Sequence, residues 1–372
     1  MRNGIERKLF IAATSQNDGK TTCSLGLVGG FSHLAQSVGF IKPVGQRYLT
    51  IDGQRIDEDS VLLQRVWGLR CPLKDMSPIA IERNFTRQYL DNPAGIYPKL
   101  EEAIHSSIEI ASKDNDLLII EGTGHAGVGS VFDLSNAKVA RMLDARVVIV
   151  SRGGIGGPVD QIAINQNLFE KEGVPVIGVV ANKVAPDKLE QTRDYLTKAL
   201  QRRGLELLGA IPYTGRLTWP TVKHIAESLD AEVLNGEDHL TNEVAEVVIG
   251  AMTPHNAVKF LADGSLLIVP GDRDDIVLAA VTMELLREDL KISGIVLTGD
   301  LRLAPQILEL VCKTHIPLLA VKPPTYDTAS EINDITVKIM ETDTDKIQLV
   351  TELVKKHVDL DKLWSLLGCD NS

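Results

Sequence analysis

The tripeptide Gly19-Lys20-Thr21 is the first stretch of this sequence whose residue types could bind phosphate. It follows the apolar run 9–12 and a polar loop, and it opens a long segment of helical character. In a strand–loop–helix unit of this kind, backbone N–H groups surround phosphates, the lysine faces the β and γ oxygens, and the threonine hydroxyl ligates Mg²⁺. The motif G-x-x-x-x-G-K-[ST] has its first glycine where Thr14 stands here. We interpret the stretch as a phosphate-binding loop with one departure; the alternative is an ordinary turn.

Two strand ends could complete a nucleotide site. A strand predicted at 116–121 ends in Glu121, and a carboxylate beside the phosphates can hold Mg²⁺ directly or through water. A strand predicted at 174–182 ends in Asn182, whose amide could donate to N7 of adenine and accept from its exocyclic amine. The guanine-reading pattern Asn-Lys-x-Asp has Ala185 in place of its aspartate, which favours ATP over GTP. A turn at the strand end is the alternative role for Asn182.

The glycines that follow Glu121 imitate a dinucleotide-binding fingerprint. That interpretation requires an acidic residue at the end of the next strand, and Ser151 stands there. We therefore predict a loop that lets the backbone approach a ligand, with Gly124 and His125 as candidate contacts. A solvated loop histidine is the alternative for His125.

The elements that must position these residues alternate along the chain. The first set of predicted strands is 8–13, 38–44, 116–121, 145–151, 174–182 and 207–211, and the predicted helices are 21–36, 59–66, 97–112, 158–171 and 187–202. This alternation predicts an α/β fold with a parallel sheet and helices on both faces. Strands that are apolar nearly throughout fit a sheet that is covered on both faces. The polar stretches 45–58 and 71–96 are predicted to be long functional loops or an insertion.

A second alternating set follows the turn-rich stretch 212–220. Its predicted helices are 222–229, 274–287, 304–314 and 345–357, and its apolar runs are 244–249, 265–270, 294–298 and 316–321. We predict a P-loop domain at 1–214, a smaller α/β domain at 215–345 and a C-terminal helical segment at 346–372.

Polar loops that follow the strands of the second domain contain Asp272, Arg273 and Thr298. These loops could converge on one ligand crevice at the carboxyl ends of the strands. Acidic residues in the first turn of the helix after Arg273 also fit a purely structural role, because they complement the helix dipole.

Composition narrows the classes of partner. The net charge of −11 disfavours broad binding to nucleic acid or to anionic membranes. No apolar run reaches the ~18 to 20 residues of a membrane-spanning helix. Four scattered cysteines lack a C-x-x-C pair, as expected for free thiols in a reducing compartment. We predict a cytoplasmic protein that binds small molecules, with no nucleic-acid or membrane partner.

Residues 8–212 resemble the dethiobiotin synthetase group of P-loop proteins. In that group the loop sequence is Gly-Thr, four variable residues and Gly-Lys-Thr. Thr14 therefore matches the group's threonine, and the residue that departs from the group's sequence is Ala13, which replaces its glycine. The sequence "KPVG" at 42–45 resembles the family's Lys-Pro-Val-Ala, and "DSVLLQR" at 59–65 resembles the segment that carries a metal-binding aspartate.

The resemblance implies ATP and Mg²⁺ as cofactors and assigns roles residue by residue. Nucleotide contacts fall on Thr14, Asp18, Gly19, Lys20, Thr21, Thr22 and Asn182, metal contacts on Thr21, Asp59 and Glu121, and catalytic roles on Lys20 and Lys42. Lys42 would face a carbamate or carboxylate of the substrate. Gln46 replaces a family serine in the substrate segment, Gln16 replaces a threonine in the loop, and 125–137 does not resemble the enzyme's substrate loop. These departures argue against binding of diaminopelargonate in the enzyme's manner.

Residues 221–340 resemble the DRTGG domain, whose name-giving motif is replaced here by "GDRDD". Such a domain follows a dethiobiotin-synthetase-like domain in the N-terminal half of long bacterial phosphate acetyltransferases, and it occurs in regulatory regions of some pyrophosphatases. The chain therefore resembles that N-terminal half. Acetyl transfer is not expected, because the acetyltransferase domain has no counterpart in the 372 residues.

Two functions follow from these features. The first is a slow ATPase or a nucleotide-dependent regulatory sensor, linked to acyl-phosphate or small-carboxylate metabolism. The second is an ATP-dependent ligase that activates a small carboxylate or carbamate. In both, a small anionic metabolite is the expected second ligand, and the P-loop class implies a homo-oligomer, a dimer or higher.

Overall fold

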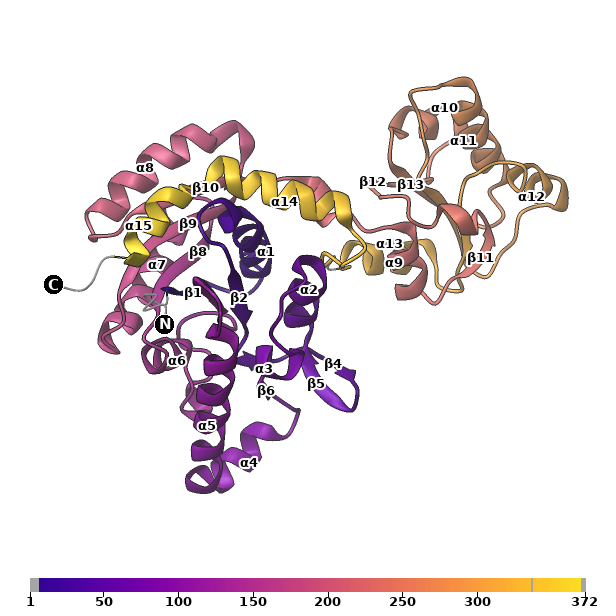
Figure 1. Cartoon of the computed structure of the whole chain (residues 1–372). Coiled ribbons are helices and arrows are strands. Elements are labelled where there is room, and N and C mark those ends of the chain that lie inside the picture. Colours follow the sequence, from indigo (N-terminus) through magenta and orange to yellow (C-terminus); the bar gives the residue numbers. More distant parts are fainter. Residues whose placement is uncertain (1–6, 336, 369–372) are drawn as a thin grey trace. The chain divides into compact units, whose positions relative to one another are not determined.

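The computed structural model describes residues 7–335 and 337–368 and divides the chain into two compact units. One unit comprises Met1–Tyr213 and Ile339–Ser372, and the other comprises Thr214–Lys338. Each is α/β, which confirms the predicted fold class (Figure 1).

The first unit is built on a six-stranded parallel sheet. Its strands are β1 (Arg7–Ala13), β2 (Val38–Ile41), β7 (Leu117–Glu121), β8 (Arg146–Arg152), β9 (Val176–Val184) and β10 (Leu207–Pro212). Their order is β10-β9-β8-β1-β7-β2, so β1 is central between β7 and β8. Because the carboxyl ends of parallel strands meet at one edge, the segment after β1 lies beside the segments that follow β7 and β8.

Helices cover both faces of this sheet (Figure 1). The helices of this unit are α1 (Lys20–Gly30), α2 (Glu58–Trp67), α3 (Leu73–Met76), α4 (Phe85–Asp91), α5 (Pro93–Ser112), α6 (Asn136–Met142), α7 (Gly157–Lys171), α8 (Leu189–Gln201), α14 (Thr344–His357) and α15 (Leu360–Gly368). The strands are buried accordingly, and every residue of β7 is buried. This double burial accounts for their nearly continuous apolar sequences.

The polar stretches predicted as loops or an insertion contain short elements. They are β3 (Val44–Gly45), paired with β6 (Ile79–Ala80), and the antiparallel hairpin β4 (Tyr48–Ile51) with β5 (Gln54–Asp57). Asp52 and Gly53 both have positive φ at the hairpin tip, as a two-residue hairpin turn requires. The hairpin delivers Asp57 to the N-cap of α2, where its side chain accepts from the Asp59 N–H at 2.9 Å.

The C-terminal helices do not form a separate part, contrary to the predicted boundary at 346. Residues from 339 onward belong to the first unit, where α14 packs along α1 and α15 packs against β1 and β10. Glycines make the approach of α14 possible: a Cβ at Gly26 would lie 2.4 Å from Cγ2 of Val354. The apolar stripe of α14, which includes Val350 and Val354, is buried in this contact.

The second unit holds a five-stranded sheet in the order β11-β15-β14-β13-β12. Its elements are β11 (Glu232–Asn235), β12 (Glu246–Ile249), β13 (Ser265–Pro270), β14 (Gly294–Thr298) and β15 (Leu318–Ala320), with α9 (Val222–Ser228), α10 (Pro254–Ala257), α11 (Asp274–Leu286), α12 (Pro305–Val311) and α13 (Thr325–Asn333). Four strands are parallel, and β11, which the sequence analysis did not predict, is antiparallel to β15.

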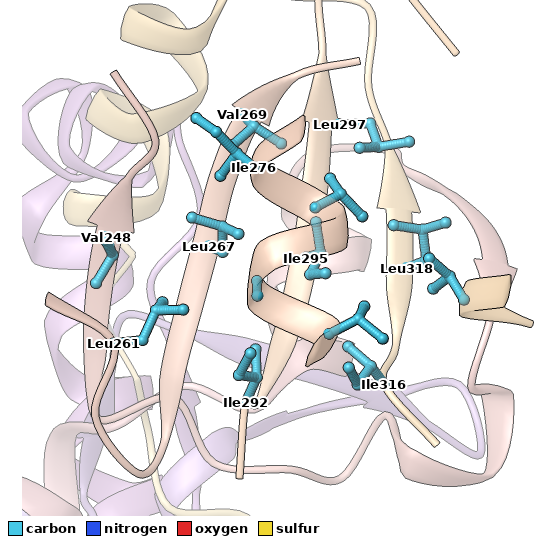
Figure 2. Close-up of a cluster of buried hydrophobic side chains, with 14 of the residues drawn as sticks. Val248, Leu261, Leu267, Val269, Ile276, Ile292, Ile295, Leu297, Ile316 and Leu318 are labelled. Carbon is cyan, nitrogen blue, oxygen red and sulfur yellow. The ribbon is translucent and has the colours of Figure 1, made fainter. Parts of the chain in front are cut away.

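Alternation along β13 gives this unit a core on each face of its sheet. Leu267 packs with Ile276 of α11 in one cluster (Figure 2), whereas Leu266 packs with Ile225 of α9 in the other. In the described part of the chain, no helix has both the length and the apolar character to cross a membrane. Three of the four cysteines, Cys23, Cys71 and Cys312, are free thiols, and Cys369 lies outside the described residues.

Candidate nucleotide-binding site

The loop between β1 and α1 is closed by its own side chains. Asp18 is 1% exposed, and its Oδ2 accepts from the Thr14 hydroxyl at 2.6 Å and from the Ser15 N–H at 2.7 Å. The Thr14 N–H donates to the carbonyl of Val150 at 3.0 Å. Thr14 does not have positive φ, so the threonine meets the backbone demand of this position without glycine. Asp18, predicted to contact nucleotide, stabilises the conformation of the loop here through these two hydrogen bonds.

Gly19 is the residue of the loop that needs its conformational freedom. It has φ +94°, and a Cβ at this position would lie 2.1 Å from Nδ2 of Asn182. Its carbonyl accepts from the Cys23 N–H at 2.9 Å and so begins α1, whose first turn holds Lys20, Thr21 and Thr22. The last residues of the motif therefore lie at a helix N-terminus, where the helix dipole favours an anion.

Asn182 lies against this loop, at the end of β9. Its Nδ2 donates to the carbonyl of Asp18 at 2.9 Å, and its Oδ1 accepts from the Lys183 N–H at 2.9 Å. Lys183 reaches the same loop, because its Nζ donates to the carbonyl of Asn17 at 2.7 Å. The sequence analysis missed this contact of Lys183. The adjacent Asn182-Lys183 pair was the one feature of the sequence that could have pointed to it.

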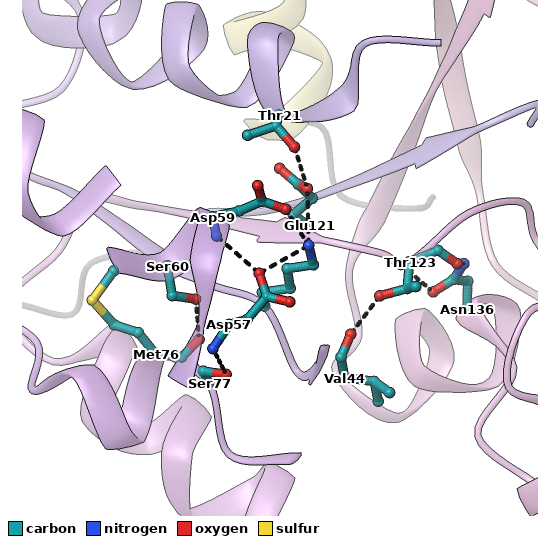
Figure 3. A network of polar contacts seen from close by, with 11 residues as sticks. Thr21, Val44, Asp57, Asp59, Ser60, Met76, Ser77, Glu121, Thr123 and Asn136 are labelled. Atoms are coloured by element: carbon teal, nitrogen blue, oxygen red, sulfur yellow. Dashed lines mark hydrogen bonds and ion pairs between the residues drawn. The ribbon is translucent and has the colours of Figure 1, made fainter. Parts of the chain in front are cut away.

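A buried cluster of one ammonium and three carboxylates lies beside Thr21 (Figure 3). Lys42 Nζ is 3.0 Å from Oδ1 of Asp57 and 3.6 Å from Oε1 of Glu121, and it also pairs with Oδ2 of Asp59. The Thr21 hydroxyl donates to Oε1 of Glu121 at 3.1 Å. The predicted residues Thr21, Lys42, Asp59 and Glu121 are thus brought together. Asp57 is an additional member of the cluster that the sequence analysis missed. Aspartate is preferred at helix N-caps, and this preference could have indicated that Asp57 stands at the start of the helix.

Neighbouring strands supply the cluster. Glu121 is the last residue of β7, and Lys42 directly follows β2, which pairs with β7 in parallel. Asp57 and Asp59 come from the start of α2, which the β4–β5 hairpin leads into.

Burial is the largest single influence on the pKa of each of these groups. Burial raises the pKa of Glu121 to about 7; the charge of Lys42 acts in the opposite direction and that of Asp59 adds to the rise. The pKa of Asp57 is also raised by burial, against the effect of Lys42. Burial acts to lower the pKa of Lys42, but Asp59, Glu121 and Asp57 together raise it above its ordinary value. The pKa of Lys20 is lowered, chiefly by burial.

The donor set fits Mg²⁺ held jointly with phosphates. Oδ2 of Asp57 and Oε2 of Glu121 are buried without a hydrogen-bond partner among the described residues. Carboxylate and hydroxyl oxygens are the ligands that Mg²⁺ prefers, and one or two carboxylates suffice when phosphates supply the rest. Across residues 7–335 and 337–368, no group of three or more His, Cys, Asp or Glu side chains is arranged to hold a metal by itself.

The other candidates of the first unit border this region without joining the cluster. Gln46 and His125 are exposed, and Gly124 has φ +70°. The loop after β7 is shaped by Asn136, a residue the sequence analysis missed. Its Nδ2 donates to the carbonyls of Thr123 and His125, both at 2.7 Å (Figure 3 shows Asn136 beside Thr123).

Two of the three candidates of the second unit, Thr298 and Arg273, make contacts within that unit. Thr298 is 1% exposed, and its hydroxyl bonds to that of Thr325 at 2.7 Å. Arg273 pairs with Asp275 at 2.8 Å and donates to the carbonyl of Met252, while Asp272 is exposed. Asp272 and Arg273 lie in the loop after β13, and Thr298 is the last residue of β14, but the structure gathers no ion-pair cluster from these three residues.

Comparison with known families also divides the chain into two parts. The model of the AAA domain matches residues 7–221, and the model of the DRTGG domain matches residues 224–335. Phosphate acetyltransferase of Pseudomonas putida is 31% identical over 366 residues, which cover 94% of this chain and 50% of that protein. Phosphate acetyltransferase of Escherichia coli is 23% identical, with 97% of this chain and 53% of that protein covered. The chain thus spans about half the length of the curated relatives it matches.

Similarity to solved structures is weaker. The MinC:MinD cell division protein complex of Aquifex aeolicus has a TM-score of 0.36 and 15% identity, covering 57% of this chain and 83% of that chain. The CBS and DRTGG domains of Clostridium perfringens pyrophosphatase, complexed with the activator diadenosine tetraphosphate, have a TM-score of 0.26 and 16% identity, covering 47% of this chain and 87% of that chain.

Proposed function

The chain belongs to the AAA domain family matched by its residues 7–221, with a DRTGG domain after it, and on this premise we propose that it binds Mg-ATP at the loop 14–19. We further propose that it acts as a slow ATPase or a nucleotide-dependent regulatory protein in acyl-phosphate or small-carboxylate metabolism. The names of its phosphate acetyltransferase relatives support the metabolic context.

One observation carries the proposal: the Thr21 hydroxyl meets Glu121 directly at the start of α1, and the second oxygen of that carboxylate is buried without a partner. A buried carboxylate oxygen that lacks a hydrogen bond costs free energy unless a ligand satisfies it. Thr21, Glu121 and Asp59 would hold Mg²⁺ here, and the ion would neutralise charge on the β- and γ-phosphates.

The residues of the chain have separable tasks in this proposal. Lys20 and the N–H groups at the start of α1 bind the phosphates and orient them toward the carboxylate cluster. Lys42 balances the charge of Asp57, Asp59 and Glu121 when nucleotide is absent. Because Lys42 is engaged with these carboxylates and only 7% exposed, it is not poised to hold an acceptor anion, which supports slow hydrolysis or sensing over ligation.

The second candidate function is an ATP-dependent ligase for a small carboxylate or carbamate. The observation that favours it is the place of Lys42: although engaged with carboxylates, its ammonium lies 3.6 Å from the Glu121 oxygen that accepts from Thr21 at the start of α1. Binding of Mg²⁺ by the carboxylates would release Lys42 toward a substrate anion.

Phosphate release from Mg-ATP distinguishes the two functions. The purified chain is assayed alone, with pooled cellular metabolites, and with acetate or acetyl phosphate. The proposed function predicts slow release that metabolites change little. A large stimulation by a metabolite would favour the ligase, and failure to bind ATP would refute both. We also propose a homo-oligomer, which light scattering after size-exclusion chromatography tests.

A further inference from the structure

Two consecutive residues at the end of β9 hold two consecutive carbonyl groups of the phosphate-binding loop. Asn182 Nδ2 donates to the carbonyl of Asp18 at 2.9 Å, and Lys183 Nζ donates to the carbonyl of Asn17 at 2.7 Å. Both contacts join segments that are about 165 residues apart in sequence, so they fix the loop to the sheet rather than to its own neighbours.

The geometry of the peptide bond means that these two contacts also fix the direction of the next N–H groups along the chain, those of Asp18 and Gly19. In a planar trans peptide, the carbonyl of one residue and the N–H of the next point in opposite directions. When the carbonyls of Asn17 and Asp18 are held toward β9, the N–H groups of Asp18 and Gly19 must face away from β9. Within the described part of the chain, no hydrogen bond of standard geometry joins either N–H to a protein acceptor, although the turn at Gln16–Asn17 brings the Asp18 N–H toward the carbonyl of Ser15. The Gly19 N–H is available to an anion, and the Asp18 N–H can reach one by leaving this weak turn contact.

The contacting side chains are themselves fixed. Asn182 is 5% exposed, and its Oδ1 accepts from the Lys183 N–H, which sets the orientation of the amide. Lys183 has φ +57°, a backbone conformation that few residues other than glycine adopt. The close approach of Asn182 Nδ2 to Gly19 leaves no space for a side chain at Gly19.

We infer that Asn182 and Lys183 are positioning residues that aim the N–H groups of Asp18 and Gly19 at the phosphates of the bound nucleotide. This inference rests on the proposed nucleotide site and deepens it. It gives Asn182 a role that is independent of the base, in place of the adenine contact predicted from the sequence. The ligand chemistry that both residues serve is a polyphosphate chain.

Base-free polyphosphate separates the two roles of Asn182. Binding of ATP, GTP and inorganic tripolyphosphate, each with Mg²⁺, is measured by calorimetry for the wild type, Asn182→Ala and Lys183→Met. The positioning role predicts that each variant loses about 10-fold or more in affinity, by a similar factor for all three ligands. Lys183→Arg keeps a cationic donor and should recover much of the loss. Lys188→Met, which removes an exposed lysine from the following turn, is the matched control and should bind as the wild type does.

Selective loss of ATP affinity in Asn182→Ala, with tripolyphosphate binding unchanged, would establish base reading and overturn the inference. A second measurement is independent of any ligand: ¹⁵N relaxation of the nucleotide-free protein. Backbone order parameters at Asn17–Gly19 should fall from about 0.85 toward 0.6 in Asn182→Ala and Lys183→Met. A loop that stays equally rigid in both variants contradicts the inference. If the wild type binds no polyphosphate, the proposed function fails and this inference fails with it. If the wild type binds polyphosphate and both variants bind it equally well, only this inference fails.

Discussion

Replacing Lys42 by methionine removes the only ammonium in direct contact with the buried carboxylates of Asp57, Asp59 and Glu121 among the described residues. Methionine has nearly the length of the lysine side chain and carries no charge, so the change is mainly one of charge. The variant takes away the ammonium that the three buried carboxyl groups share. We expect a large loss of stability in the absence of Mg²⁺.

The distances set the size of the effect. At an effective dielectric constant of about 20, a pair at 3.0 Å gains about 5 kcal/mol and a pair at 3.6 Å nearly as much. Desolvation of the ammonium offsets much of this gain, and removal of one partner from a buried ion pair typically costs about 3–5 kcal/mol. For a unit of this size, that loss lowers the melting temperature by about 6–20 °C.

The assay is calorimetric melting of the wild type, Lys42→Met and the exposed control Lys188→Met at pH 6 and pH 8, with and without Mg²⁺. Burial already raises the pKa of Glu121 to about 7, so protonation relieves the uncompensated charge at pH 6. The loss in Lys42→Met should therefore be larger at pH 8, and Mg²⁺ should restore part of it by replacing the ammonium. A melting temperature equal to that of the wild type at pH 8 without Mg²⁺ would refute this account of the cluster.

Three further changes test other parts of the structure. Burial raises the pKa of Glu121 in the folded protein to about 7, above its ordinary value of 4.5, so the folded protein binds more protons than the unfolded chain between these two pH values. In Mg²⁺-free urea titrations, the free energy of unfolding of the wild type should therefore fall relative to that of Glu121→Gln as pH rises from about 5 to 8. A difference between the two proteins that does not change with pH would contradict the shift. Gly19→Ala should displace the Asn182 amide and weaken ATP binding, measured by calorimetry, at least about 10-fold. Gly68→Ala is the control, because Gly68 also has positive φ (+61°) but has open space around it; this variant should lose about 1 kcal/mol of stability and keep its ATP affinity. Gly26→Ala should destabilise the first unit by about 1–3 kcal/mol in denaturant titrations through its clash with Val354, and Val354→Ala in the same chain should recover part of that loss; additive losses would argue against the packing of α14 on α1.

The sequence predicted those parts of the fold whose signals are local and repeated. Strands such as β7 are apolar throughout because helices cover both faces of the sheet, and this leaves a plain pattern. The β4–β5 hairpin has short, partly exposed strands with no such pattern, and only its Asp52-Gly53 tip signalled a turn. The docking of α14 on α1 depends on the glycine face of a helix more than 300 residues away, which no local pattern reveals.

The candidate site divides in the same way. Thr21 and Glu121 were foreseeable as neighbours. Glu121 ends one strand, the loop before Thr21 follows the adjacent strand, and the carboxyl ends of parallel strands lie at the same edge of the sheet. Asp57 joins them only through the hairpin that precedes α2, which the sequence analysis did not resolve. The contact of Lys183 with the loop depends on its positive φ, a property that side-chain type alone does not specify.

Titration of ATP into the wild type and Lys20→Met, each with and without Mg²⁺, tests the central claim most directly. The account predicts micromolar binding to the wild type that strengthens with Mg²⁺. It predicts a loss of about 100-fold or more in Lys20→Met, because a charge-assisted contact to phosphate is removed. Equal affinity of the two proteins for ATP, or no binding to the wild type at millimolar ATP, would contradict it.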